Sequence, residues 1–204
     1  MKKIILGLSF VIIAIAANAQ KIIGECTVDF TVTYTDKANV ASGITSTLYI
    51  KAKQARLELN SQAFTQSKIF NGKTGDVIIL QDAGNSHFMR KLSSAKWLGA
   101  NKKFEGATLN SSTDKKTILG YECEKATLTL KDGSSYKLYY TKAITPSFNE
   151  YEYQFKDVPG FVLEYESTDE KGANKITYSA TKINLNPVPA AKFDVPTTGY
   201  RVIE

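Results

Sequence analysis

Apolar and polar side chains alternate along much of the chain with a period of two. From Val28 to Tyr34, the apolar residues Val28, Phe30, Val32 and Tyr34 are separated by single polar residues. Such alternation places one face of a β-strand against a core and the other in solvent. The same period marks further stretches at residues 44–50, 55–59, 126–130, 136–140, 151–155, 161–166 and 176–180. A short continuous apolar run at 77–80 is typical of a strand covered on both faces. We therefore predict a protein that is mainly β.

Turn residues separate these stretches and indicate how the strands connect. Asp132-Gly133 is a strong signal for a tight hairpin, because both residues tolerate positive φ angles. Pro159-Gly160 fits a type II turn in which the glycine takes the positive φ. Residues 92–104 have the composition of a short helix. The predicted fold is a curved antiparallel sheet or half-open β-barrel with one or two short helices.

The N-terminal residues carry the features of a secretory signal peptide. Lys2 and Lys3 precede an apolar run that ends in Ala17-Asn18-Ala19, where small residues suit a signal peptidase. The run is shorter than the roughly 20 apolar residues that a membrane-spanning helix needs. We expect cleavage near Ala19, with 1–19 as the signal peptide and 20–204 as a single antiparallel β-domain. The expected location is periplasmic or secreted, with no transmembrane segment in the mature chain.

The charge of the chain changes this picture little. The formal net charge is +6, and the positive residues are mostly lysines spread along the sequence. A nucleic-acid-binding protein would cluster this charge, usually with arginine and exposed aromatic side chains. Dispersed lysine instead protects sheet edges and keeps a protein in solution. We therefore expect no nucleic-acid partner.

Few residues carry the chemistry of a metal site or an active site. Cys26 and Cys123 are the two cysteines, and either a disulfide between them or two separate buried thiols fits an exported protein. His87 is the only histidine, too few for a typical metal site, and no nucleophile elbow surrounds it. We predict no metal, no cofactor and no catalytic residue, and hence a protein that is not an enzyme.

Two pairs of glutamates could in principle act as acid and base. Glu150 and Glu152 share one face of a predicted strand, and Glu164 and Glu166 share a face of another. Both pairs alternate with aromatic residues that should be buried, so we expect the carboxylates to face solvent and to pair with lysines across the sheet.

The tyrosines and phenylalanines mostly occupy the apolar faces of the predicted strands. Either they pack an ordinary core, or they line a concave sheet face that holds an apolar ligand. Under the second interpretation, the candidate lining residues are Phe30, Val32, Leu48, Ile50, Leu57, Leu128, Tyr140, Tyr153 and Phe161.

Three motifs in the second half of the chain resemble a known family. They are Gly120-Tyr121-Glu122-Cys123 before a strand, Pro159-Gly160 leading into apolar residues, and the ending at 193–200. With the signal peptide, they resemble an uncharacterised family of exported envelope proteins related to the GLPGLI type. At the fold level this group is similar to lipoprotein carriers of the LolA/LolB type. That resemblance implies a curved sheet around an apolar cavity that holds acyl chains, with helices as a lid.

Three hypotheses about function follow. The first is a non-enzymatic envelope protein that binds an apolar ligand, a lipid or a lipidated partner on its concave sheet. The second is a protein-interaction or structural module of the cell envelope with a filled core. The third is a hydrolase that uses His87 or a glutamate pair.

Overall fold

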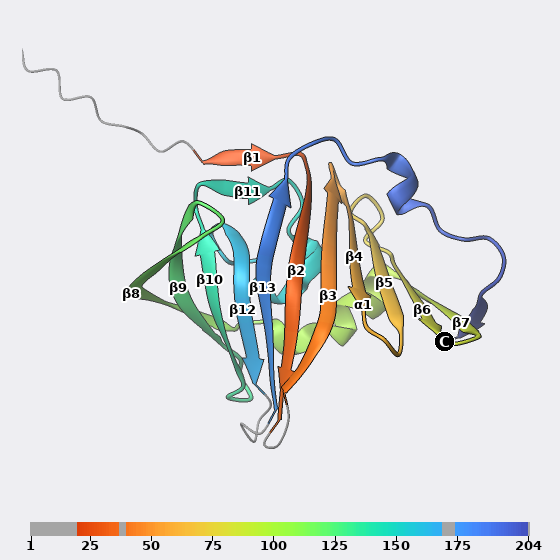
Figure 1. Ribbon diagram of the computed structural model, residues 1–204, viewed down its shortest axis with the longest axis horizontal. Coiled ribbons are helices and arrows are strands. Elements are labelled where there is room, and N and C mark those ends of the chain that lie inside the picture. The colour runs from red at the N-terminus through yellow and green to blue at the C-terminus, as the bar shows by residue number, and fades with distance from the viewer. Residues whose placement is uncertain (1–19, 37–39, 169–173, 204) are drawn as a thin grey trace, which may run out of the picture.

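The computed structural model describes residues 20–36, 40–168 and 174–203. The predicted signal peptide therefore lies outside the described residues. Within them, twelve strands form one curved sheet that stays open (Figure 1). In sheet order the strands are β14 (Arg201–Ile203), β7 (Ser86–Leu92), β6 (Val77–Ala83), β5 (Thr65–Asn71), β4 (Gln54–Asn60), β3 (Val40–Lys51), β2 (Glu25–Thr35), β13 (Lys175–Asn184), β12 (Phe161–Thr168), β10 (Ser135–Thr141), β9 (Tyr121–Thr129) and β8 (Thr108–Ile118).

The sheet consists of two antiparallel meanders that meet at its centre. Strands β2 to β7 follow one another in sequence, and so do β8, β9 and β10 at the other end. The meanders join where β2 pairs with β13, with Val32 opposite Tyr178. At one edge the short β14 pairs in parallel with β7. A separate parallel pair, β1 (Lys21–Ile23) and β11 (Ile144–Pro146), lies across one end. The predicted curved antiparallel sheet is confirmed.

The inner face of the sheet carries the main core. Directly paired residues point to the same face, and one such row runs from Val28 through Leu48 and Leu57 to Lys68 and Ile79. The core cluster on this face includes Val28, Leu48 and other fully buried side chains. Apart from Lys68, the named members of the row are apolar, as the period-two pattern predicts.

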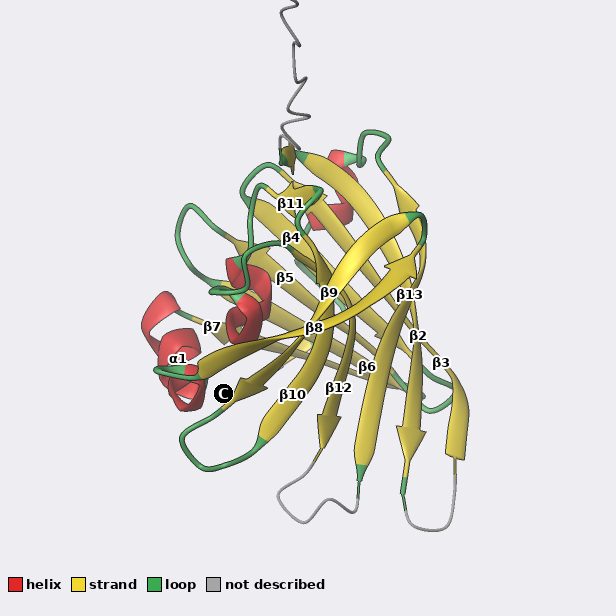
Figure 2. Cartoon of the chain, turned by 90° about the vertical axis from the view of Figure 1, so that its left-hand side faces the viewer, coloured by secondary structure: helices red, strands yellow, loops and turns green. Residues whose placement is uncertain are grey.

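Short helical segments lie on the concave side. The helix α1 (Ser94–Ala100) continues into the 3-10 turn η1 (Lys102–Phe104), and a second 3-10 segment is η2 (Glu150–Phe155). Figure 2 shows α1 beside the open side of the curved sheet. Ser93 caps α1 by accepting a hydrogen bond from the Lys96 amide, and Trp97 packs on Phe70 of β5 at 5.3 Å between ring centroids. The predicted short helix at 92–104 is confirmed.

The C-terminal segment covers part of the convex face. After η3 (Ala190–Phe193), the chain runs to β14 along the outside of the sheet (Figure 1). Arg56 donates a hydrogen bond to the carbonyl oxygen of Lys192 at 3.0 Å, and the Lys192 ammonium lies 4.6 Å from the centre of the Tyr49 ring. Tyr200 packs on a small outer cluster that contains Ile69 and two further buried residues.

Two stretches differ from the sequence prediction. Residues 151–155, predicted as a strand, form the kinked segment η2 instead. Tyr151 and Phe155 are buried and lie four residues apart, a spacing that also suits one face of a helical turn. The edge strand β8 was missed because almost all of its side chains are exposed and polar, which leaves no apolar period to detect.

The two cysteines are free thiols in the core. Cys26 and Cys123 are fully buried and are not bridged, so the structure has separate thiols in place of the candidate disulfide. Burial raises the pKa of the Cys26 thiol to about 12 and that of Cys123 to about 11. Both therefore behave as small apolar groups in the core.

Across residues 20–36, 40–168 and 174–203, no helix has the length and apolar character needed to cross a membrane.

Of the two predicted turns, Asp132-Gly133 forms as expected, whereas the glycine of Pro159-Gly160 is required for a different physical reason. The Asp132-Gly133 hairpin is confirmed, with Gly133 at a φ of 86°. Gly160 is not among the residues with positive φ. A Cβ atom at Gly160 would lie 2.2 Å from the backbone oxygen of Thr141, so the glycine is required by the close approach of β10.

This contact generates a stability prediction. Gly160→Ala should lower the free energy of unfolding by about 2 kcal/mol or more, because the backbone of β10 must shift to admit the methyl group. Gly24→Ala is the control, because a Cβ there meets nothing within 4 Å. Chemical denaturation measures both, and equal unfolding midpoints for the two variants would contradict the interpretation.

Candidate functional site

The helical segments cover the inner face of the sheet incompletely. Between them and the sheet remains a cavity of about 420 Å³, which we call the concave cavity. Its sheet wall comes from β4, β5, β10, β12 and β13, and its opposite wall comes from α1, η1, η2 and the residues that join α1 to η1. Small-molecule sites in proteins span roughly 300–1,000 Å³. The concave cavity therefore has the size of a ligand site.

Aromatic side chains form most of the apolar wall of this cavity. They are Trp97, Phe104, Tyr136, Tyr151, Tyr165 and Tyr178. Tyr165 and Tyr178, on adjacent strands, stack with ring centroids 4.5 Å apart and an interplanar angle of 11°. Tyr165 also meets Phe155 edge-on at 4.8 Å. These ring contacts hold the wall in a fixed shape, as a preformed site requires.

Three charged side chains also line the cavity. Lys68 lies on the inner face of β5, directly between Leu57 of β4 and Ile79 of β6 in the paired strands. Glu152 enters from η2, and the exposed Lys103 enters from η1. The cavity is thus amphipathic, with aromatic walls and a small number of charged groups.

Glu152 sits at the kink of η2, where its own φ of −113° and ψ of 80° interrupt the helical turn. Protein surrounds its carboxyl group, although the group still borders the cavity. Burial raises the pKa of Glu152 to about 7, and the attraction of Lys68 and a hydrogen bond from Tyr165 offset only part of that effect. The Tyr165 hydroxyl donates this bond at 3.3 Å. Glu152 therefore exchanges its proton near neutral pH.

The same burial affects the groups that face Glu152. It lowers the pKa of Lys68, although the attraction of Glu152 opposes this shift. It raises the pKa of Tyr151, Tyr165 and Tyr178, and the negative charge of Glu152 adds to the rise. The three phenols therefore stay neutral and can donate hydrogen bonds.

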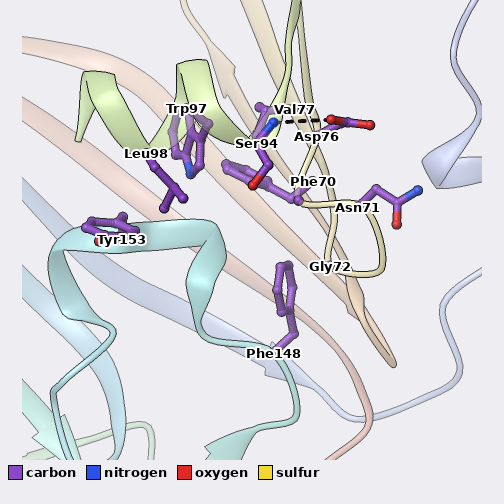
Figure 3. Close-up of a pocket in the computed structure, with 11 residues that line it drawn as sticks. Phe70, Asn71, Gly72, Asp76, Val77, Ser94, Trp97, Leu98, Phe148 and Tyr153 are labelled. Carbon is purple, nitrogen blue, oxygen red and sulfur yellow. Dashed lines mark hydrogen bonds between the residues drawn. The ribbon is translucent and has the colours of Figure 1, made fainter. Parts of the chain in front are cut away.

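A smaller pocket of about 180 Å³ lies on the other side of Trp97, and we call it the side pocket. Figure 3 shows Trp97 of α1 next to Phe70, Leu98 of α1 just above Tyr153, and Phe148 below them. The Ser94 amide donates a hydrogen bond to the Asp76 carboxylate at 3.2 Å and ties α1 to the end of β5–β6. Trp97 is a shared wall of both spaces.

The structure distributes the sequence-predicted lining residues over several places. Leu57 lines the concave cavity, and Tyr153 lines the side pocket. Phe161 borders a narrow crevice of about 10 Å³ beside η2. The remaining candidates are buried within the sheet and line neither space: Phe30, Val32, Leu48, Ile50, Leu128 and Tyr140.

Glu152 differs in its setting from Glu164 and Glu166, and the side chain of Glu150 lies outside what the structure describes. Glu164 pairs with Lys116 at 2.7 Å, and Glu166 pairs with Lys175 at 2.6 Å, as expected for solvent-facing carboxylates. Glu152, which was expected to face solvent too, instead points into the concave cavity. The error follows from the misassigned strand at 151–155, because η2 turns this side chain inward.

His87 lies near the start of β7. Its Nδ1 atom is 2.6 Å from the Asp82 carboxylate, and Tyr200 donates to the other oxygen of Asp82 at 3.1 Å. This group is exposed on the β6–β7 hairpin, away from the lining of the concave cavity and the side pocket. Among the described residues, no group of three His, Cys, Asp or Glu side chains is placed to hold a metal ion.

Sequence reasoning missed the residues that distinguish this cavity. Lys68 is a lysine at an inward position of a strand, and only the register with Leu57 and Ile79 reveals it. The inward position of Glu152 was missed because the alternating aromatic residues at 151–155 fit a strand as well as the helical turn that they form. A usable signal was Trp97 within the short predicted helix, because this large apolar side chain packs on Phe70 of β5 and lines the cavity.

The buried carboxyl generates a pH prediction. The pKa of Glu152 is about 7 in the folded protein and 4.5 in its unperturbed state, so the folded form binds more protons between these values. The free energy of unfolding should therefore fall as pH rises from 5 to 8, by about 1–3 kcal/mol from this group. Glu152→Gln should remove this loss.

Denaturant unfolding at several pH values measures the effect. The difference between the wild-type protein and the variant isolates the Glu152 carboxyl from other titrating groups. Glu122→Gln is the control, because Glu122 is exposed and pairs with Lys115 at the surface. A pH dependence that is the same in wild type and Glu152→Gln would show that the carboxyl is not held in a buried setting.

Comparison with known proteins gives a likeness of fold. No family model and no curated protein matches the chain. Among solved structures, an uncharacterised conserved protein from Thermus thermophilus is 11% identical, with a TM-score of 0.53 and 91% of each chain covered. At this identity, the match shows that the two proteins share an overall fold.

Looser likenesses have TM-scores below 0.5. The Pseudomonas aeruginosa MucA/MucB complex matches at 12% identity and a TM-score of 0.48, covering 87% of this chain and 58% of that one. A LolA superfamily protein from Nitrosomonas europaea matches at 11% identity and 0.40, covering 88% and 94%. PNGF-II matches at 12% identity and 0.48, covering 87% of this chain. The chain spans only 31% of the PNGF-II chain.

Proposed function

We propose that this protein is an exported envelope protein that binds an apolar or amphiphilic ligand, a lipid or a lipidated partner in the concave cavity. The observation that carries the proposal is the cavity itself, about 420 Å³ of space left between the inner sheet face and the helical segments. A filled interior, the alternative expected for an interaction or structural module, would have left no such space.

The construction of the walls supports ligand binding. Stacked and edge-on aromatic rings give a rigid apolar surface, and apolar ligands gain free energy by leaving water for such a surface. One side of the cavity is formed by the short segments α1, η1 and η2. Neither α1 nor η1 contains a buried residue. Small movements of these segments can admit a chain-like ligand without breaking the sheet.

The exposed edge of the sheet gives less support to a partner-binding role. Strand β8 is the outermost strand on its side. It has a register shift between Ser111 and Lys115, and Lys115 and Lys116 both form ion pairs. Bulges and charged side chains are devices that prevent edge strands from pairing with other chains. We therefore place the binding function in the cavity.

Native mass spectrometry with lipid extraction tests this proposal. Protein purified from the periplasm of an expressing cell, or incubated with envelope lipids, should carry an acyl species. Ala100→Trp should reduce the bound fraction by about tenfold, because Ala100 lines the cavity and the larger side chain occupies ligand space. Ala191→Trp, on an exposed turn of η3, should bind as the wild type does.

Circular dichroism establishes that both tryptophan variants are folded before binding is compared. A clean ligand-free mass after incubation with envelope lipids would contradict the proposal. So would equal binding by Ala100→Trp and Ala191→Trp, since the ligand would then lie outside the cavity.

A further inference from the structure

Lys68 lacks the ion pair that several other lysines of the sheet form. Lys51, Lys116 and Lys142 each form an ion pair with a glutamate at 2.7–2.8 Å. Within the described residues, the side-chain ammonium of Lys68 forms no ion pair and no hydrogen bond, although the residue lies on the inner face of the sheet. Protein surrounds it sufficiently that burial lowers its pKa. An interior ammonium without a contacting counter-ion is costly unless a ligand supplies one.

Glu152 does not serve as that fixed counter-ion. The two groups attract each other across the cavity, but no oxygen of Glu152 comes within 4 Å of the Lys68 ammonium in the part of the chain that the structure describes. Glu152 is held instead at the kink of η2 by the hydroxyl of Tyr165. The space between the two side chains belongs to the cavity and is open to a ligand group.

The charge of the cavity selects among ligand head groups. Lys68 and Lys103 contribute two positive charges to the lining and Glu152 contributes at most one negative charge. A cationic head group would meet two lysines, whereas an anionic one would meet the unpaired ammonium of Lys68. Protonation of Glu152 increases this positive balance and creates a hydrogen-bond donor.

We propose that Lys68 binds the anionic head group of an amphiphile, a carboxylate or a phosphate monoester, whose apolar tail lies along the aromatic wall of the concave cavity. This inference rests on the proposed ligand-binding function and names its ligand class. The ammonium and the head group form a charge-assisted hydrogen bond at a position where protein partly surrounds the lysine. The neutral phenol of Tyr178 is a second candidate donor, since it lines the same cavity.

Binding of such a ligand is coupled to the proton on Glu152. The groups that face its carboxyl are Lys68 of β5, Tyr165 of β12, Tyr178 of β13 and Tyr151 of η2 itself. Lys68 is the basic side chain among them, and an anion bound to its ammonium would repel an ionised Glu152. The anionic ligand therefore binds more tightly at pH 6 than at pH 8.

The fluorescence of Trp97 provides a direct readout, because it is the only tryptophan of the chain and lines the cavity. The full chain is titrated with dodecanoate, dodecyl phosphate, dodecanol, dodecylamine and inorganic phosphate. Dodecanoate and dodecyl phosphate should bind at least about tenfold more tightly than dodecanol. Inorganic phosphate should bind weakly, because it lacks the tail.

Lys68→Met tests the residue itself. It removes the ammonium but keeps an unbranched side chain, and loss of a desolvated charge should leave the fold intact. Affinity for dodecanoate should fall about tenfold, while affinity for dodecanol stays unchanged. Lys91→Met is the matched control, with the same loss of charge at an exposed position on the opposite face of the sheet. It should leave every affinity unchanged.

Any other outcome contradicts one specific part of the proposal. Equal affinity for dodecanoate and dodecanol, or no effect of Lys68→Met, overturns the role of Lys68 and leaves the proposed function standing. Tighter binding of dodecylamine overturns the anionic class and points to Glu152 as the recognition group. Inorganic phosphate that binds as tightly as dodecyl phosphate overturns the amphiphile. Failure of every dodecyl probe to bind overturns the proposed function as well.

Discussion

The strong curvature of the sheet is the constraint on which the other features of this structure depend. A curved sheet has a concave face that must be shielded from water, and among the described residues the helical segments on that face are α1, η1 and η2. Trp97 anchors α1 to Phe70, and Tyr151 anchors η2 to the same ring from another side. Between these anchor points the sheet remains uncovered, and the concave cavity occupies that space. Curvature thus explains both where the helical segments lie and why a cavity remains between them and the sheet.

The convex face is shielded from water by a different kind of segment. Its shielding comes from the C-terminal segment, which lies along the outside of β3 to β7 and ends as β14. Arg56 and Lys192 hold this segment through a side chain to backbone hydrogen bond, and Tyr200 packs on the outer apolar cluster. The outer face is therefore covered in part by extended chain, while the inner face is covered by helical segments that leave the concave cavity between them and the sheet.

The fold was predictable from the sequence to the extent that burial leaves a local pattern. Val28 to Tyr34 alternates because one face of β2 is buried, and Asp132-Gly133 marks the β9–β10 hairpin by backbone chemistry alone. Strand β8 leaves no pattern because it lies at an edge and exposes nearly all of its side chains. The site was harder to predict because it depends on contacts between distant segments. Lys68 is interior only by virtue of its neighbours on β4 and β6, and the inward turn of Glu152 depends on a kink within an aromatic stretch that also resembles a strand.

The pairing of β2 with β13 at the centre of the sheet has a consequence for how the chain folds. Thr35 lies opposite Lys175 and Thr27 opposite Asn184, so residues separated by well over half the chain must meet before the two meanders become one sheet. Closing loops of this length is entropically costly, and proteins dominated by such distant contacts fold slowly. An N-terminal fragment would contain β2 without its central partner and would expose one long unpaired edge. The order of strands therefore keeps the chain from completing its structure until nearly all of it is available.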